Sequence, residues 1–156
     1  MPYCEWFESM SVGVSLLDAD HRILAGHISR LQQDLRDGAD PEALEQLFDG
    51  LIAFIEFHFF REAKVMEICG FPDAGAYQEE RADFIGYIYE WRDRNLRGTG
   101  SPITIELLHY LKGWFIHHVL IWDMAYKPYV ENNALGVEVA ETFGPALVDD
   151  VAAASS

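Results

Sequence analysis

The sequence predicts an all-α fold: an antiparallel up-and-down four-helix bundle with an N-terminal arm and a short C-terminal extension. Three observations predict it. Four segments place apolar residues three and four positions apart, as amphipathic helices do. Glycine, proline and N-capping residues separate these segments, and no alternating strand pattern competes with them. We expect residues 1–133 to form the arm and the bundle, and residues 134–156 to form the extension.

The first two helices have recognisable start and stop residues. Asp18 is the expected N-cap of the first, which ends at Gly38. Asp40 and Pro41 start the second, because proline suits the first helical position, and it runs to Cys69 before a glycine. The arm before the first helix should pack across the bundle through four apolar side chains: Trp6, Phe7, Val12 and Val14.

The third and fourth helices follow the same logic. The third should run from about Ala76 to Leu96. Ser101 as N-cap and Pro102 at the first helical position open the fourth, which reaches about Met124 and is closed by Pro128. The Ala-rich extension should form a short extra helix or remain partly disordered. The core face of the third helix carries Phe84, Ile88 and Trp91.

Composition excludes several classes of partner. The 156 residues include 11 Lys and Arg against 26 Asp and Glu, a formal net charge of -15. A chain this acidic repels phosphate backbones and anionic lipid surfaces, so we expect no nucleic acid and no membrane as partners. No apolar run is long enough to cross a bilayer, no leader pattern opens the chain, and the two cysteines, Cys4 and Cys69, are expected to stay unpaired. These features favour a cytoplasmic location, and they leave the oligomeric state open.

A metal site is the chemistry that the histidines suggest, because bundles build such sites from inward-facing His and carboxylate residues. His58 and Glu62 lie four residues apart, so they share one helix face and can bind one ion together. Aromatic neighbours predict that this face is buried, where a carboxylate without a partner costs several kcal/mol. These neighbours are Phe57, Phe59 and Phe60.

The spacing of His118 and Asp123 is less informative. Five residues separate them, which in an ideal α-helix turns the side chains about 140° apart. His21, one turn into the first helix, is a further candidate ligand. The remaining histidines are expected to be solvated or to support the site without binding metal: His27, His109 and His117.

Three separated motifs resemble those of bacterial hemerythrins, over a stretch from about Trp6 to Tyr129. The first is Val12-Gly13-Val14 followed by Asp18-Ala19-Asp20-His21 with Leu24. The second is His58-Phe59-Phe60-Arg61-Glu62 with Met66, followed by Phe71-Pro72. The third comprises Trp114, His118, Asp123 and Tyr126.

The resemblance implies a four-helix bundle in which two non-haem irons bind dioxygen reversibly through five histidines, one glutamate and one aspartate. On this basis His21 and His58 match the ligands of the iron at which dioxygen binds. Glu62 and Asp123 match the bridging carboxylates, and His118 matches one of three histidines on the other iron.

This chain differs from the family pattern at two ligand positions, because Tyr77 and Arg81 stand where the resemblance places histidines. In one interpretation, Tyr77 supplies a phenolate, with help from Glu80, and a dinuclear centre survives. Anionic oxygen ligands favour ferric iron, which disfavours reversible carriage.

In the other interpretation, Arg81 forms a salt bridge with Glu62 or Asp123. One metal then remains on His21, His58 and a carboxylate, with His118 outside the coordination sphere. The sequence slightly favours the dinuclear interpretation.

The expected function is therefore binding of dioxygen, or another small diatomic ligand, at non-haem iron, with two irons favoured and one possible. Two alternatives stay open. One is a module that senses oxygen, redox state or iron with one metal or none, and the other is an oxidase- or peroxidase-like iron enzyme. We regard a non-enzymatic binding protein as the better of these interpretations.

Overall fold

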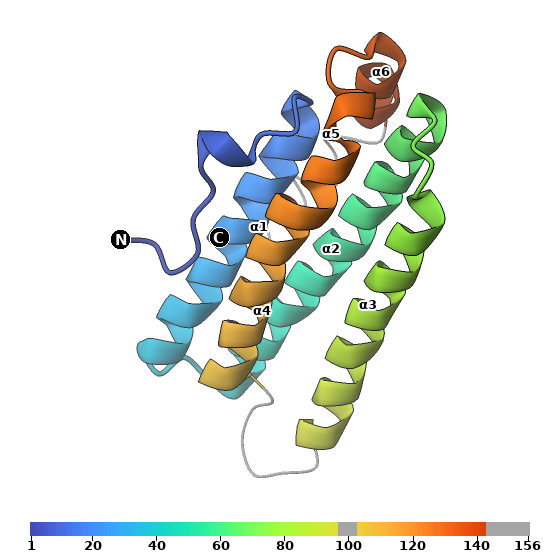
Figure 1. Cartoon of the computed structure of the whole chain (residues 1–156). Helices are drawn as coiled ribbons and strands as arrows, with labels where there is room; N and C mark the ends of the chain where they lie inside the picture. Colours follow the sequence, from blue (N-terminus) through green and yellow to red (C-terminus); the bar gives the residue numbers. More distant parts are fainter. Residues whose placement is uncertain (97–102, 143–156) are drawn as a thin grey trace.

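Four long helical rods form an antiparallel bundle in the structure, a computed structural model that describes residues 1–96 and 103–142 (Figure 1). The predicted all-α class and bundle architecture are confirmed. The rods are α1 (Ser15–Arg36), α2 (Pro41–Cys69), α3 (Ala74–Leu96), and a composite fourth rod made of α4 (Ile105–His117), the π-helical turn η2 (His118–Asp123) and α5 (Met124–Val130). A short 3-10 helix, η1 (Glu8–Met10), lies in the arm, and α6 (Ala134–Thr142) follows the bundle.

The start of α1 differs from the prediction. The helix begins at Ser15 with Val14 as its N-cap, so Asp18 lies inside the first turn. The Asp18 carboxylate instead accepts the Val12 N–H at 2.9 Å and the Ser11 hydroxyl at 2.6 Å. The expected N-cap is therefore wrong, because this carboxylate ties the arm to the helix and does not cap the helix itself.

The boundaries of α2 are as predicted, and those of α3 nearly so. Pro41 opens α2, and Gly70 closes it in the left-handed conformation with φ 72°, which glycine adopts without strain. The third helix begins at Ala74, two residues before the expected start.

The fourth rod begins later and ends later than predicted. Ser101 and Pro102 lie outside the described residues, and α4 begins at Ile105 with Thr104 as N-cap. The Thr104 hydroxyl accepts the Leu107 N–H at 3.3 Å, which satisfies one free donor of the first turn. At the other end the helix continues past Pro128, because the buried Val130 holds the last turn of α5 in the core.

The N-terminal arm and α6 pack on the bundle. In the arm, Val12 and Val14 are buried as predicted, whereas Phe7 is 52 % exposed. The expected extra helix is present as α6, which lies against α2, and residues 143–156 lie outside the described part of the chain. A Cβ atom on Gly136 would lie 2.7 Å from the Cys69 sulfur, so α6 needs a residue without a side chain there.

The core divides into two apolar clusters with a polar layer between them. Three buried polar residues lie, along the sequence, between a member of the larger apolar cluster and a member of the smaller one. The three examples are His21 between Leu24 and Leu17, Glu62 between Phe59 and Val65, and Asp123 between Val119 and Tyr126. The polar layer is therefore sealed by apolar packing at both ends.

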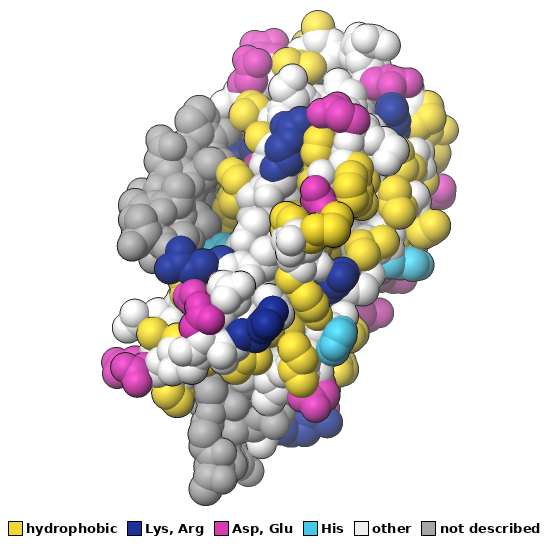
Figure 2. Space-filling view, turned by 90° about the vertical axis from the view of Figure 1, so that its left-hand side faces the viewer, with side chains coloured by type: hydrophobic (Ala, Val, Ile, Leu, Met, Phe, Trp, Pro, Cys, Tyr) yellow, Lys and Arg dark blue, Asp and Glu magenta, His cyan; other side chains and the backbone are white. Residues whose placement is uncertain are grey.

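The acidity of the chain lies mostly on its surface. Among the described residues, the buried carboxylates are those of Asp18, Asp20, Glu62 and Asp123. Figure 2 shows charges of both signs scattered among exposed apolar side chains on one face. Within the described ranges, no helix has the length and apolar character that crossing a membrane requires. Both cysteines are free, as expected.

Candidate metal centre

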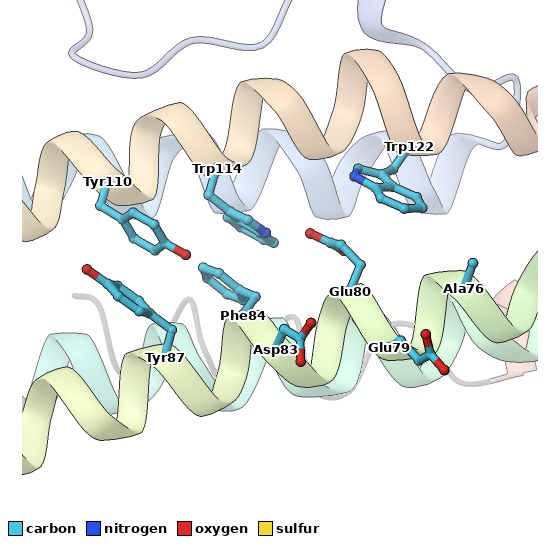
Figure 3. A pocket seen from close by; sticks show the side chains of 9 residues that line it. All are labelled: Ala76, Glu79, Glu80, Asp83, Phe84, Tyr87, Tyr110, Trp114 and Trp122. Carbon is cyan, nitrogen blue, oxygen red and sulfur yellow. The ribbon is translucent and has the colours of Figure 1, made fainter.

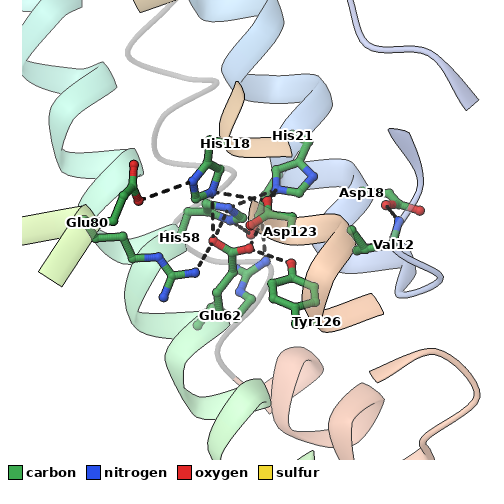
Figure 4. A network of polar contacts seen from close by, with 12 residues as sticks. Val12, Asp18, His21, His58, Glu62, Glu80, His118, Asp123 and Tyr126 are labelled. Carbon is green, nitrogen blue, oxygen red and sulfur yellow. Dashed lines mark hydrogen bonds and ion pairs between the residues drawn. The ribbon is translucent and has the colours of Figure 1, made fainter. Parts of the chain in front are cut away.

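Five side chains from three of the rods converge in the polar layer (Figure 4). His21 comes from α1, His58 and Glu62 come from α2, and His118 and Asp123 come from η2. All five are 0 % exposed, and one ligand atom of each lies within 4.8 Å of the others. The structure thus brings together the five residues for which the sequence offers the strongest case.

The donor atoms surround a single point. The Nε2 atoms of His21 and His58 lie 3.1 Å apart. His21 Nε2 is 2.9 Å from Asp123 Oδ2, and His58 Nε2 is 2.9 Å from Glu62 Oε1. His118 Nε2 lies 3.3 Å from Glu62 Oε1 and 3.2 Å from Asp123 Oδ2. Three imidazole nitrogens and two carboxylate oxygens are a suitable donor set for divalent iron.

The π-helical turn explains how His118 and Asp123 share this point. A π-helix bonds residue i to residue i+5, so residues five apart stack on one face, whereas an α-helix would turn them apart. His117, the neighbour of His118, is exposed, as the sequence suggested. Helical periodicity alone could not predict this local change of pitch.

Charges within the centre shift the pKa values of its members. Burial by itself lowers the pKa of a histidine, yet the Glu62 charge and the hydrogen bond that His58 donates to Asp20 raise the pKa of His58 to about 9. In the same way, the Asp123 and Glu62 carboxylates overcome burial and raise the pKa of His118 to about 10. Burial acts to raise the pKa of Glu62, but His58 and Arg81 hold it well below its usual range. The carboxylates of Glu62 and Asp123 therefore favour positively charged groups in this layer.

Asp20 supports the centre from behind. Its Oδ2 atom accepts a hydrogen bond from His58 Nδ1 at 2.8 Å, and its Oδ1 atom accepts one from Arg61 Nη1 at 2.7 Å. Both Asp20 and Arg61 are 0 % exposed. The proton on Nδ1 leaves the lone pair of His58 Nε2 directed at the other ligands. The sequence does not predict this role of Asp20, because its only signal there is a carboxylate directly before His21.

Tyr126 closes one side of the centre. Its hydroxyl donates to Glu62 Oε2 at 2.5 Å, and burial raises the pKa of the phenol well above its usual value. The hydroxyl therefore keeps its proton and fixes the orientation of the Glu62 carboxylate.

Arg81 and Tyr77 lie at the edge of the centre. Arg81 Nη2 donates to Glu62 Oε1 at 3.0 Å, a contact that the second interpretation of the sequence anticipates. The Tyr77 ring packs edge-on against Phe71 and Trp122. Burial, followed by the charges of Asp123 and Glu62, raises the pKa of the Tyr77 hydroxyl.

Glu80 lies on the opposite edge of the His118 imidazole from Nε2. Its Oε2 atom is 4.0 Å from His118 Nδ1, and burial raises the pKa of its carboxyl. Glu80 also lines a cleft of about 590 Å³ between α3 and α4 (Figure 3). Trp114 stacks on both His118 and Phe84 and separates the cleft from the centre.

The other histidines do not join the centre. His109 accepts or donates a 3.2 Å hydrogen bond with the Tyr3 hydroxyl at the surface. His27 is 6 % exposed, which corrects the expectation of a solvated side chain. The imidazole lies against α2, where a Cβ atom on Gly50 would be 3.7 Å from its Cε1 atom, and burial lowers the pKa of His27.

The residues of the centre fit a bound cation. Among the described residues, both Asp123 oxygens lack a hydrogen-bond donor that meets bonding geometry, although two imidazole nitrogens lie close to one of them. A buried carboxylate in this state needs a positive charge. A metal ion bound by the imidazole nitrogens would supply that charge and would satisfy all five donors together.

Comparison with known proteins agrees with this geometry. Residues 12–130 match the family model of the hemerythrin HHE cation binding domain. The chain is 25% identical to a myohemerythrin from Theromyzon tessulatum over 126 residues, which cover 81% of this chain and 92% of that protein. It is 26% identical to a bacteriohemerythrin from Stenotrophomonas maltophilia (strain R551-3) over 129 residues, covering 81% of this chain and 80% of the relative.

Solved structures show the same fold. A crystal structure of a hemerythrin point mutant superposes with a TM-score of 0.76 at 19% identity, covering 84% of this chain and 99% of the other. Because the family model covers the bundle and the five donors lie inside it, the chain belongs to the hemerythrin family of cation-binding domains, whose members bind non-haem iron and dioxygen.

Proposed function

We propose that this chain binds one non-haem iron through His21, His58, Glu62, His118 and Asp123, and that the iron reacts with dioxygen. The observation that carries the proposal is the convergence of these five buried donors within 4.8 Å. Ferrous iron would supply an electron to dioxygen at a site from which apolar packing excludes water.

The contact between Arg81 and Glu62 supports one iron in preference to two. Two divalent ions beside Arg81 would bring a charge of plus five against two carboxylates, in a layer that is buried on all sides. One divalent ion with Arg81 brings plus three, which is a much smaller excess. The Arg81 guanidinium, 3.0 Å from Glu62, therefore supplies positive charge that a second metal ion would otherwise supply.

The dinuclear interpretation needs Tyr77 to bind as a phenolate. Burial and two nearby carboxylates oppose ionisation of this hydroxyl, since both raise its pKa. Glu80 would help such a centre only by moving, because it faces Nδ1 of His118 and not Nε2. These observations favour a neutral Tyr77 in the metal-free protein, where its ring packs against Phe71 and Trp122.

Oxidase- or peroxidase-like chemistry is the second candidate. The hydrogen bond from Tyr126 to Glu62 favours it, because this bond holds an oxidisable phenol beside the site where iron would bind. If this candidate holds, Tyr126→Phe should slow the consumption of hydrogen peroxide by the iron-loaded protein while the iron content stays unchanged.

An anaerobic titration with ferrous iron tests the main proposal. The loaded protein is expected to show a new visible absorption when dioxygen is admitted, and the metal-free protein is expected to show none. Removal of dioxygen should not reverse the change, because ferrous iron would be oxidised to ferric iron while dioxygen takes up that one electron and leaves as superoxide. Loaded protein that gives no optical response to dioxygen would contradict the proposal.

A further inference from the structure

A row of aromatic rings leads from the metal centre to the outer cleft. The Trp114 indole stacks on the His118 imidazole, with ring centroids 5.0 Å apart and 26° between the ring planes. The indole also stacks on Phe84, at 3.9 Å and 11°. The Tyr110 ring lies nearly parallel to that of Phe84, with centroids 6.1 Å apart. Neighbouring rings therefore connect a candidate metal ligand to the cleft between α3 and α4 (Figure 3).

Two members of this row, Trp114 and Tyr110, are oxidisable. Both lie on α4, four residues apart, so their side chains share one helix face. Electron tunnelling weakens steeply with distance, and two oxidisable rings one helical turn apart are well placed to exchange an electron. Phe59 and Phe115 also pack against candidate histidine ligands, but phenylalanine resists oxidation. Trp114 is therefore the aromatic neighbour of these imidazoles that can give up an electron.

The position of Tyr110 suits it to lose an electron together with a proton. A phenol releases its hydroxyl proton when it is oxidised, and Tyr110 is 36 % exposed, so solvent can take up this proton. Trp114 is only 8 % exposed, and its oxidised indole would carry a positive charge. Three acidic side chains line the cleft beside these rings and would stabilise that charge. They are Glu79, Glu80 and Asp83.

Peroxide chemistry at a single iron requires an electron from outside the metal. Reduction of hydrogen peroxide to two waters consumes two electrons and two protons. One ferrous ion supplies one electron and becomes ferric. Oxidation of Tyr110 would supply the second electron and release one proton to solvent, from which both protons are drawn.

Tyr126 is the competing electron donor, because its hydroxyl donates to Glu62 at 2.5 Å. Its side chain is 0 % exposed. The proton of an oxidised Tyr126 would pass to Glu62, which would remove negative charge from a candidate metal ligand. Oxidation of Tyr110 has no such cost, since its proton leaves outside the centre.

We propose that Trp114 and Tyr110 form an electron-transfer path through which Tyr110 supplies the second electron when the ferrous centre reduces hydrogen peroxide. Trp114 passes an electron to the centre, and Tyr110 then reduces the oxidised indole. The products are ferric iron, two waters and a neutral tyrosyl radical at the edge of the cleft. The path rests on the peroxide chemistry that is the second candidate function.

Addition of hydrogen peroxide to anaerobic ferrous protein tests the path. Electron paramagnetic resonance of frozen samples reports ferric iron and the organic radical separately. The spin trap 2-methyl-2-nitrosopropane, followed by peptide mass spectrometry, locates the radical. Tyr110→Phe removes one oxygen atom, and Trp114→Phe keeps an aromatic ring against His118. Tyr89→Phe is the matched control, because Tyr89 lies on α3 outside the row and its hydroxyl donates to Glu56.

Wild-type protein and Tyr89→Phe are expected to give equal yields of ferric iron and of a radical trapped mainly on Tyr110. At unchanged iron content, both Tyr110→Phe and Trp114→Phe should lose this radical. Ferric iron without an organic radical, a trap mainly on another residue, or an undiminished Tyr110 radical in Trp114→Phe would overturn the path alone. Wild-type protein that binds no iron, or whose ferrous iron peroxide does not oxidise, would overturn the peroxide chemistry and the path with it.

Discussion

Arg81 donates a hydrogen bond from Nη2 to Glu62 Oε1 at 3.0 Å, inside a layer of the bundle that is closed to solvent. The same Glu62 oxygen lies 2.9 Å from His58 Nε2 and 3.3 Å from His118 Nε2. The guanidinium is therefore an integral neighbour of the candidate ligands. Its fixed charge is the main reason to expect that this centre differs from one with histidines at both altered positions.

Replacing Tyr77 and Arg81 together with histidine should convert the centre to a dinuclear one. The double variant removes the fixed charge and adds two neutral nitrogen ligands one helical turn apart. We expect the iron content to rise from about one to about two per chain, measured by elemental analysis of iron-replete protein. Tyr77→His alone is the control and should keep one iron, because Arg81 is still present. A double variant that still holds one iron would argue against charge as the cause.

Removing the Arg81 charge should destabilise the metal-free protein. Arg81→Met leaves Glu62 with less positive charge in a buried layer, which should cost about 2 kcal/mol or more in the free energy of unfolding. Urea denaturation measures the loss. The metal-loaded variant should lose less, because the cation compensates Glu62. Equal unfolding free energies for metal-free wild type and variant would show that Arg81 does not balance this charge.

Asp20→Asn should weaken metal binding about 10- to 100-fold, because the amide no longer holds the His58 proton on Nδ1 as a carboxylate does. Competition with a chelator of known affinity measures the effect. Asp18→Asn is the matched control, since Asp18 also lies in α1 but holds the arm through Val12 and Ser11. The control should lose stability and keep its metal affinity. If both variants bound metal like wild type, Asp20 would have no positioning role.

Metal affinity should rise with pH. In the metal-free protein the pKa values of His58 and His118 are raised to about 9 and about 10, so both carry a proton near neutral pH. A ligand nitrogen must lose that proton, so each such histidine can add up to about tenfold in affinity per pH unit until the pH passes its pKa. Affinities measured at several pH values, in buffers that do not bind metal, should climb until about pH 10. An affinity independent of pH between 6 and 9 would show that the two nitrogens are not protonated before binding.

Most helix positions were predictable because they depend on local patterns, whereas the candidate ligands His21, His118 and Asp123 came from the family resemblance. Pro41 and Gly70 mark the ends of α2 by backbone preference alone, and the spacing of His58 and Glu62 follows from the α-helical pitch. The pairing of His118 with Asp123 could not be derived from that pitch, because a π-helical turn brings them together.

Contacts between helices were harder to predict than contacts within one helix. Asp20 reaches His58 and Arg61 across the α1–α2 interface, so sequence spacing contains no sign of the contact. For the same reason, the sequence is compatible with two alternative directions for the Arg81 side chain. For Asp18 the local pattern was misleading. The residue type is typical of an N-cap, but its carboxylate accepts hydrogen bonds from Ser11 and Val12 of the preceding arm.

The number of iron atoms per folded chain tests the central claim most directly. Native mass spectrometry of protein loaded anaerobically with excess ferrous iron, and then freed of unbound metal, resolves chains with no, one or two ions. The Arg81–Glu62 contact and the five converging donors predict one iron per chain. A population dominated by chains with two irons, or with none, would contradict the account.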